Sequence, residues 1–132
     1  MYVLIDKNCK IKLNHSEIFL RADGIVEIHV HENADIGEKE CIDIMNAYEQ
    51  ILEPKKYPLL HLVGNYVTMD KEAREFSSSE EGLRFSKAEA FVINSLPHKI
   101  LANFYMKMNK PTVPTKFFGT KQEAVAWLKK FL

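Results

Sequence analysis

Apolar and polar residues along this chain follow two different periods, and these periods separate the expected strands from the expected helices. Residues 59–63 form the clearest feature, because their side chains are almost continuously apolar. A short run of this kind is typical of a strand that is covered on both faces of a sheet. Gly64 and Asn65 end the run, and Thr68 and Asp70 then provide side-chain oxygens with which a helix can begin. The run therefore predicts a buried strand that leads through a short turn into a helix.

The N-terminal part of the chain predicts antiparallel strands. Residues 10–13 alternate between polar and apolar side chains, which is the pattern of a strand with one buried face. Residues 18–21 and 25–31 flank Asp23-Gly24, a pair that favours a hairpin because glycine tolerates the positive φ of tight turns. We therefore expect a β-hairpin here, preceded by residues 1–8 as a lead-in or an edge strand. The second arm places Val26, Ile28 and Val30 on one face and Glu27, His29 and His31 on the other.

Helical and strand patterns alternate through the rest of the chain. Helices are expected over residues 38–52, 69–76, about 78–85, about 95–108 and 120–131, and strands over residues 88–93 and 115–118. Ser78 with Glu81 and Thr120 with Glu123 have the spacing of capping boxes, and Ser95 can cap the fourth helix. The buried stripe of that fourth helix is expected to contain Ile100, Leu101, Phe104, Tyr105 and Met108.

This order of elements predicts a single α/β domain over residues 1–132. Helical crossovers make consecutive strands parallel, whereas the hairpin is antiparallel. The expected architecture is therefore a mixed sheet of four to five strands, with an N-terminal antiparallel hairpin followed by parallel strands. About four to five helices pack against this sheet.

The composition excludes several classes of function. The chain has 18 basic and 18 acidic residues, and such neutrality argues against nucleic-acid binding, which usually needs a clustered basic surface. No run reaches the roughly 18 apolar residues that span a bilayer, so no membrane span is expected. The first residues lack the features of a secretory signal, and Cys9 and Cys41 lack the spacing of a zinc or redox motif. We therefore expect a reduced, cytoplasmic protein in which Cys41 is a small core residue.

Three segments resemble STAS domains and the related sporulation anti-sigma-factor antagonists. They are residues 24–28 in the hairpin, residues 69–74 after the buried strand, and residues 114–118 leading to 124–128. The resemblance, which extends over about residues 10–132, implies a STAS-like fold and a regulatory role through protein contact. It also implies a kinship with CRAL-TRIO lipid-transfer domains, which bind small molecules or lipids. In the antagonists a Ser or Thr near the start of the helix after the third strand is phosphorylated, and Thr68 is the corresponding candidate. The chain has Tyr66-Val67-Thr68-Met69-Asp70 where the antagonists have Asp-Ser-Ser-Gly.

Polar residues follow each expected parallel strand and precede the next helix. They are Asn65, Tyr66 and Thr68, then Asn94, Ser95 and His98, and finally Thr120 after Gly119. The carboxyl ends of parallel strands meet at one edge of a sheet, so these residues are expected to form a ligand or partner edge. With the free N–H groups of helix starts, such an edge suits a small anion, a phosphate group or a partner's acidic side chain. The same residues are also expected if each one only caps its own helix.

The sequence offers no established catalytic or metal site. His29 and His31, with His15 nearby, could bind a metal, but no cysteine or carboxylate stands at a supporting ligand spacing. His61 is better interpreted as a hydrogen-bonded core histidine. Nucleophile elbows, glycine-rich phosphate loops and zinc-protease motifs are absent from the sequence. We therefore expect no metal, no cofactor and no enzymatic activity.

Three functional hypotheses follow. The first is a non-catalytic module that regulates a protein partner, and it predicts a flat apolar patch near residues 66–69. The second is small-molecule or lipid binding in the CRAL-TRIO manner, which predicts a deep apolar pocket lined by Phe76, Phe85, Phe104 and Tyr105. The third is an enzyme with an unrecognised site. A homodimer could also form through the edge of the hairpin.

Overall fold

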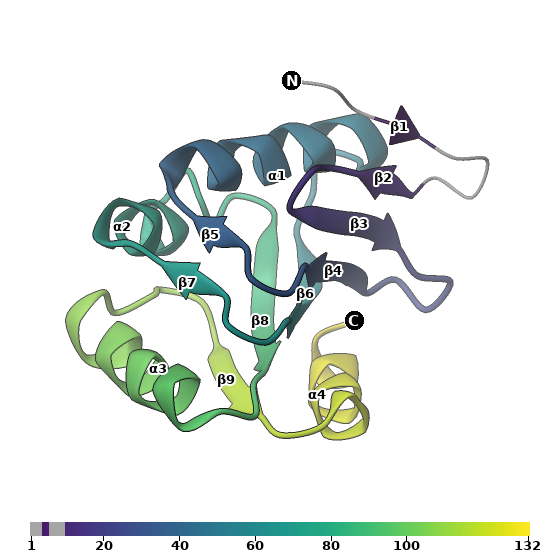
Figure 1. Cartoon of the computed structure of the whole chain (residues 1–132). Coiled ribbons are helices and arrows are strands. Elements are labelled where there is room, and N and C mark those ends of the chain that lie inside the picture. The colour runs from purple at the N-terminus through teal and green to yellow at the C-terminus, as the bar shows by residue number, and fades with distance from the viewer. Residues whose placement is uncertain (1–3, 6–9) are drawn as a thin grey trace.

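The computed structural model describes residues 4–5 and 10–132, and it contains a mixed sheet with helices on both faces (Figure 1). The strands are β1 (Leu4–Ile5), β2 (Ile11–Lys12), β3 (Ser16–Leu20), β4 (Val26–Val30), β5 (Asp35–Ile36), β6 (Tyr57–Val63), β7 (Thr68–Met69), β8 (Ser86–Val92) and β9 (Thr115–Phe118). The helices are α1 (Glu38–Ile51), α2 (Lys71–Ser78), α3 (Leu96–Met108) and α4 (Lys121–Leu128), followed by a 3₁₀ turn, η1 (Lys129–Phe131).

The main sheet has the order β1-β2-β3-β4-β6-β8-β9. The strands from β1 to β4 pair antiparallel, whereas β6 pairs parallel with both β4 and β8, and β8 pairs parallel with β9. β5 and β7 form a separate parallel pair. The structure therefore confirms the predicted α/β class with antiparallel strands first and parallel strands after. The described sheet has seven strands rather than four to five, because the two-residue strands β1 and β2 extend it beyond the hairpin.

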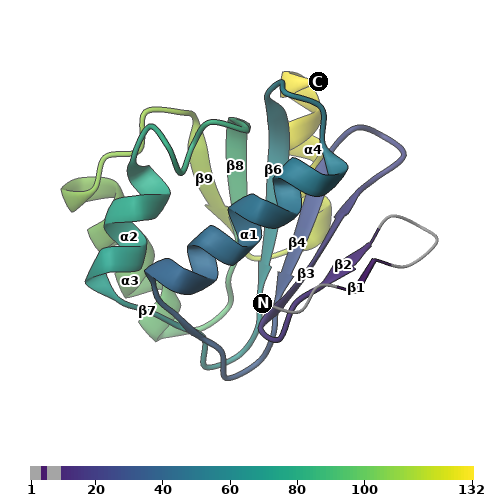
Figure 2. The same cartoon turned by 90° about the horizontal axis from the view of Figure 1, so that it is seen from above.

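The predicted central strand is β6, which lies between β4 and β8. Its neighbouring residues Leu59 and Leu60 are almost fully buried and point to opposite faces, because side chains alternate along a strand. Leu59 packs in the cluster beneath α1, while Leu60 packs in the cluster beneath α4. Figure 2 shows α1 and α4 on opposite sides of the sheet. The predicted central strand is therefore present, and it is buried over residues 57–60 and partly buried over residues 61–63.

The predicted hairpin joins β3 and β4 through a loop of five residues, 21–25. Arg21 donates from its backbone N–H to the carbonyl of Ile25, and Gly24 donates to the carbonyl of Arg21. Gly24 has a φ of +92°, which glycine adopts without the steric cost of a side chain. Beyond the loop, Glu27 is buried under α4 and accepts hydrogen bonds from Arg21 and His29.

The helix predicted over residues 78–85 is wrong, because this segment is a series of turns. Ser78 belongs to the last turn of α2, where its hydroxyl donates to the carbonyl of Arg74 instead of capping a new helix. Ser79 then ends α2 and accepts a hydrogen bond from the N–H of Gly82 at 3.1 Å. Gly82 crosses so close to α2 that a Cβ would lie 2.0 Å from the carbonyl oxygen of Phe76. The backbone therefore folds back on α2 and leaves no room for another helix.

The predicted buried stripe of α3 is only half right. Tyr105 is buried and Leu101 is partly buried, as expected. Ile100, Phe104 and Met108 are instead 61%, 47% and 66% exposed. Apolar residues surround more of α3 than one packed face can cover, so periodicity alone could not decide which of them point inward.

Among the helices that the structure describes, we found none with the length and apolar character needed to cross a membrane.

Candidate functional site

The predicted edge residues lie at the carboxyl ends of β6, β8 and β9, but two of them cap the helices that follow. Ser95 accepts a hydrogen bond from the N–H of His98 at 3.2 Å and thereby caps α3. Thr120 accepts one from the N–H of Glu123 at 3.2 Å and caps α4. Asn94 lies beside Gly119, where a Cβ would stand 4.0 Å from the Asn94 side-chain oxygen. The capping hydrogen bonds are enough to explain why Ser95 and Thr120 occupy these positions, and no ligand is needed for that explanation.

Thr68 is not at the start of a helix. It belongs to β7, and its hydroxyl donates to Asp35 of β5 at 2.6 Å. Asp70 is the cap of α2 and accepts from the N–H of Ala73 at 2.8 Å. The choice between Thr68 and Asp70 as helix cap is thus decided for Asp70, and the Thr68 hydroxyl is already engaged by a carboxylate.

The turn after β6 connects to α3 through a side chain. Asn65 and Tyr66 form this turn, in which Tyr66 has a φ of +62° and is 75% exposed. The carbonyl of Asn65 accepts from the N–H of Asn33, which fixes the turn to the segment before β5. His98 of α3 then donates from Nε2 to the carbonyl of Val67 at 2.9 Å. The edge residues of β6 and α3 therefore come together, whereas the caps serve their own helices.

A cavity of about 140 Å³ lies between α3 and the sheet. Its floor comes from β6, β8 and β9 and the residue after β8, with the side chains of His61, Val63, Glu89, Phe91, Ile93 and Phe117. His98, Leu101, Ala102 and Tyr105 of α3 form its roof, and α1 and α2 add Cys41, Ile44, Arg74 and Ser77 at its sides. We refer to it as the α3 cavity. Its lining is mostly apolar, with a few polar groups, as is usual for small-molecule sites.

Of the four residues predicted to line an apolar pocket, Tyr105 alone lines the α3 cavity. Phe76 faces a smaller adjacent space of about 60 Å³. Phe85 packs edge-on against Tyr48 with ring centroids 5.8 Å apart, and Phe104 is on the outer side of α3. Residues of the floor, such as Phe91 and Phe117, were missed because apolar strand residues give no signal of facing a cavity rather than a helix.

A buried imidazole–carboxylate pair stands in the floor of the α3 cavity. Glu89 accepts from His61 Nε2 at 2.7 Å and, through its other oxygen, from the hydroxyl of Ser86 at 2.8 Å. The His61 and Glu89 side chains are 14% and 10% exposed, so water screens this pair weakly. His61 was predicted as a core histidine with a satisfied hydrogen bond, and its Nε2 has this role. Among residues 10–132, no hydrogen bond to its Nδ1 is present.

Two further polar groups border the cavity, and neither is activated for nucleophilic chemistry. Burial raises the pKa of the Cys41 thiol to about 11, although its contact with the Ser77 hydroxyl at 3.7 Å acts in the opposite direction. A thiol in this state is a poor nucleophile at neutral pH. Burial and then the nearby charge of Glu89 raise the pKa of Tyr105 well above its ordinary value. The Tyr105 hydroxyl has no hydrogen-bond partner within the described part of the chain.

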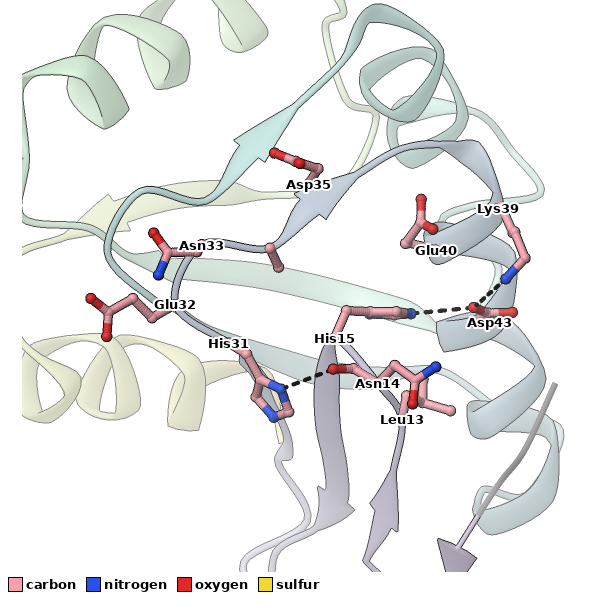
Figure 3. Close-up of a pocket in the computed structure, with 11 residues that line it drawn as sticks. Leu13, Asn14, His15, His31, Glu32, Asn33, Asp35, Lys39, Glu40 and Asp43 are labelled. Carbon is pink, nitrogen blue, oxygen red and sulfur yellow. Dashed lines mark hydrogen bonds and ion pairs between the residues drawn. The ribbon is translucent and has the colours of Figure 1, made fainter.

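A polar hollow of about 300 Å³ lies on the β3 side of β4, away from the α3 cavity and beside the start of α1 (Figure 3). His15 points at Asp43 with 3.3 Å between Nε2 and Oδ2, while Glu32 and Asp35 point away from them (Figure 3). His29 is bound to Glu27 and His31 to Glu17, so the three histidines considered as metal ligands have separate partners. No group of three metal-ligating side chains with suitable geometry occurs among the described residues.

The outer side of α3 carries an exposed apolar stripe. Leu96, Ile100, Phe104 and Met108 stand at every fourth position and therefore share one face of the helix. Their exposed fractions range from 47% to 69%. We call these four residues the α3 face. Ile100, Phe104 and Met108 were predicted to belong to the buried stripe of this helix, whereas Leu96 was not part of that prediction.

A protein-family model described as a domain of unknown function (DUF7793) matches residues 18–132. The chain belongs to this family. The matched region includes β4 to β9 and all four described α-helices, and thus both the α3 cavity and the α3 face. The search of curated proteins and the search of solved structures gave no match. The description of the family assigns no activity, so a function has to be argued from the geometry of these two features.

Proposed function

We propose that this protein is a non-catalytic binding module whose α3 face receives an apolar segment with acidic flanks from a partner protein. The observation that carries the proposal is the exposure of four large apolar side chains in one row on one helix. A contiguous apolar stripe of this kind is characteristic of interaction surfaces rather than of free surface. The proposal keeps the regulatory role by protein contact that the STAS resemblance implies.

The surroundings of the α3 face are basic. Between Glu89 and Glu123 the sequence contains no acidic residue but five lysines. Lys99 and Lys107 belong to α3 itself, and both are exposed. Arg74 of α2 adds a further cation over the Phe104 ring, at 5.2 Å from its centroid. A neutral protein thus concentrates positive charge beside an exposed apolar surface.

This charge selects the class of partner. Complementary potentials favour a partner with acidic residues and suppress association with partners of like charge. A second copy of the chain would bring its own lysines of α3 against the first set, so self-association through this face is disfavoured. An amphipathic segment with Asp and Glu beside its apolar side chains satisfies both the stripe and its basic border.

Phosphorylation of Thr68 does not enter the proposal. The Thr68 hydroxyl is bound to the carboxylate of Asp35 at 2.6 Å. A phosphate at this position would stand against that carboxylate, and like charges repel at such a distance. Tyr66, next to this site, is 75% exposed.

A lipid-binding role receives less support from the geometry. The α3 cavity has a volume of about 140 Å³. Sites for drug-sized ligands usually have volumes of about 300–1,000 Å³. A lipid chain would therefore need α3 to move away from the sheet, whereas the α3 face is available as it stands.

Site-specific photo-crosslinking in cells that naturally make the protein tests the proposal. A photoreactive amino acid replaces Ile100 in one variant and Ile42 in the control, because Ile42 of α1 is an exposed isoleucine outside the α3 face. We expect position 100 to crosslink, well above position 42, to a segment of another protein that combines apolar residues with Asp or Glu. Mass spectrometry of the crosslinked peptide identifies that segment.

Charge reversal then separates a specific contact from apolar adhesion. Lys99→Glu with Lys107→Glu is expected to abolish the crosslink from position 100. Lys129→Glu with Lys130→Glu, which reverses two exposed charges near the C-terminus, is expected to preserve it. Crosslinks to lipid, crosslinks to a second copy of the chain, or equal yields from positions 100 and 42 would each overturn the proposal.

A further inference from the structure

The size of the α3 cavity limits what it can hold. Its volume is about 140 Å³. An apolar cavity of roughly 150 Å³ in another protein stays dry when empty and binds benzene. The α3 cavity, which is partly open to solvent, therefore has room for one six-membered ring with a small substituent, but not for a second ring or a long chain.

The floor of the cavity favours an aromatic ring over an aliphatic one. His61, Phe91 and Phe117 belong to three neighbouring strands, and their rings are stacked in a row. The centroid separations are 4.3 Å and 5.0 Å, with interplanar angles of 8° and 19°. Because these separations resemble the spacing between strands, the rings stand on edge across the sheet. Such edges carry partial positive charge and attract the face of another aromatic ring.

Two residues with hydrogen-bonding groups line this apolar space, and neither group has a partner among the residues that the structure describes. Tyr105 lines the cavity from α3, and the residue is only 7% exposed. His61 belongs to the floor, and its Nδ1 has no hydrogen bond among residues 10–132. Because Glu89 accepts the proton on Nε2, Nδ1 of the neutral imidazole is an acceptor. Neither atom is sealed from water, since Asn109 Oδ1 is the one unpaired side-chain oxygen or nitrogen that is fully buried among the described residues. A bound molecule would therefore have to replace water at both groups.

A molecule that satisfies these groups needs both a hydrogen-bond acceptor and a hydrogen-bond donor. It also has to be uncharged, because the carboxylate of Glu89 stands in the same floor and would repel an anion. A phenolic hydroxyl has both functions, since it can accept from Tyr105 and donate to an imidazole nitrogen. We propose that the α3 cavity is a binding site for one neutral single-ring phenol, with its ring against the edges of His61, Phe91 and Phe117.

This proposal does not depend on the proposed partner of the α3 face. The cavity is bounded by the inner side of α3, with Leu101, Ala102 and Tyr105. The α3 face is the opposite side of the same helix, with Ile100 and Phe104. A substitution on one of these two surfaces therefore leaves the other intact. Phenol binding and partner binding can thus be tested separately.

Calorimetric titration of the full chain with phenol, toluene, cyclohexanol and decanoate tests the proposal, and amide NMR shifts locate the binding site. Phenol is expected to bind saturably, more tightly than the other three, and to shift the amides of β8 and α3. Toluene measures the contribution of the ring alone, and cyclohexanol that of the hydroxyl on a non-aromatic ring. Decanoate reports a lipid-like preference.

Tyr105→Phe removes a single oxygen from the cavity wall. Loss of one hydrogen bond is expected to weaken phenol binding by about threefold to tenfold and to leave toluene binding unchanged. Tyr48→Phe is the matched control, because Tyr48 is an equally buried tyrosine that faces the adjacent smaller space. Ala102→Leu adds volume to the roof and is expected to abolish the binding of both phenol and toluene.

Several results would overturn the inference. They are the absence of saturable phenol binding, amide shifts that lie outside the cavity, equal affinities for phenol and cyclohexanol, and a preference for decanoate. An equal effect of Tyr105→Phe on phenol and toluene would also contradict it, because the hydroxyl would then have only a packing role. The comparison of Tyr105→Phe with Tyr48→Phe stays decisive even if Ala102→Leu prevents folding.

Discussion

His61 and Glu89 stand on neighbouring strands with 2.7 Å between the imidazole Nε2 and a carboxylate oxygen, inside a mostly apolar cavity. Removal of one partner from a buried pair leaves the other partner buried without compensation. Glu89→Ala leaves His61 Nε2 and the Ser86 hydroxyl without their acceptor, so we expect it to lower the free energy of unfolding by about 1–3 kcal/mol or more. Glu89→Gln keeps a hydrogen-bonding group of nearly the same shape, so its loss should be clearly smaller. Urea denaturation of both variants measures this difference, and equal losses would mean that the pair contributes little beyond its packing.

A second buried carboxylate gives the protein a specific dependence on pH. Burial alone would raise the pKa of Glu27, but hydrogen bonds and positive charge from His29 and Lys121 outweigh it, so the pKa is lowered from its ordinary value of 4.5. A lowered folded-state pKa gives stability that is fully present above the unfolded-state pKa and is lost as the pH falls through the folded-state pKa. Glu27→Gln should thus destabilise the protein at pH 7, with a difference from the wild type that shrinks below about pH 4.5.

Denaturation curves recorded between about pH 3 and pH 7, the range in which carboxylates titrate, test the role of Glu27. Glu32→Gln is the control, because Glu32 is an exposed glutamate that follows the same strand. The control should follow the wild-type dependence on pH. A Glu27→Gln curve parallel to the wild type would show that another group causes the loss of stability in acid.

The sheet could be predicted from sequence because its strands are bounded by strong signals. Asp23-Gly24 gave the hairpin, and the apolar run over residues 59–63 gave the central strand. Both signals act within a few residues of the chain, so no knowledge of distant contacts was needed. The two-residue strands β5 and β7 were missed because so short a strand leaves no period.

The candidate site depended on contacts between distant parts of the chain, which a sequence pattern does not contain. Asn65, Asn94 and Thr120 were correctly placed after strands, but their order in the sequence could not show which would cap a helix. The partners of His61 and His98 are 28 and 31 residues away in the sequence. The two sides of α3 are equally apolar, and only its position above the sheet decides that Tyr105 faces inward and Ile100 outward.

That asymmetry of α3 predicts unequal effects of similar substitutions. Phe104→Ala removes an aromatic side chain that is 47% exposed, so we expect it to change the free energy of unfolding by less than about 1 kcal/mol. Phe76→Ala removes one that is 9% exposed and should cost about 3–5 kcal/mol. Thermal or urea denaturation compares the two variants. A large loss for Phe104→Ala would mean that the α3 face is packed against the protein itself and is not free for a partner.

The burial of Cys41 predicts a slow reaction with thiol reagents. Cys41 is 7% exposed, and burial raises its pKa to about 11, so the reactive thiolate is scarce at neutral pH. In a Cys9→Ser variant, where Cys41 is the remaining cysteine, we expect the folded protein to react with a disulfide reagent only after unfolding. The colour reaction in buffer and in urea measures both rates. Fast labelling in buffer would mean that α1 and α2 open readily around Cys41.

Two glycines at the same edge of the sheet should differ sharply in their tolerance of a methyl group. At Gly64 a Cβ would lie 2.6 Å from the backbone nitrogen of Glu32 and 2.7 Å from the carbonyl oxygen of Val30. Backbone atoms cannot move aside as a flexible side chain does, so Gly64→Ala should cost about 1–3 kcal/mol or more. At Gly119 the nearest atom that a Cβ would meet is the side-chain oxygen of Asn94 at 4.0 Å, so Gly119→Ala should stay within about 0.5 kcal/mol of the wild type. Urea denaturation midpoints compare the two variants directly. Equal midpoints would mean that the turn after β6 does not lie against residues 30–32 as closely as the hydrogen bond from Gly64 to Val30 requires.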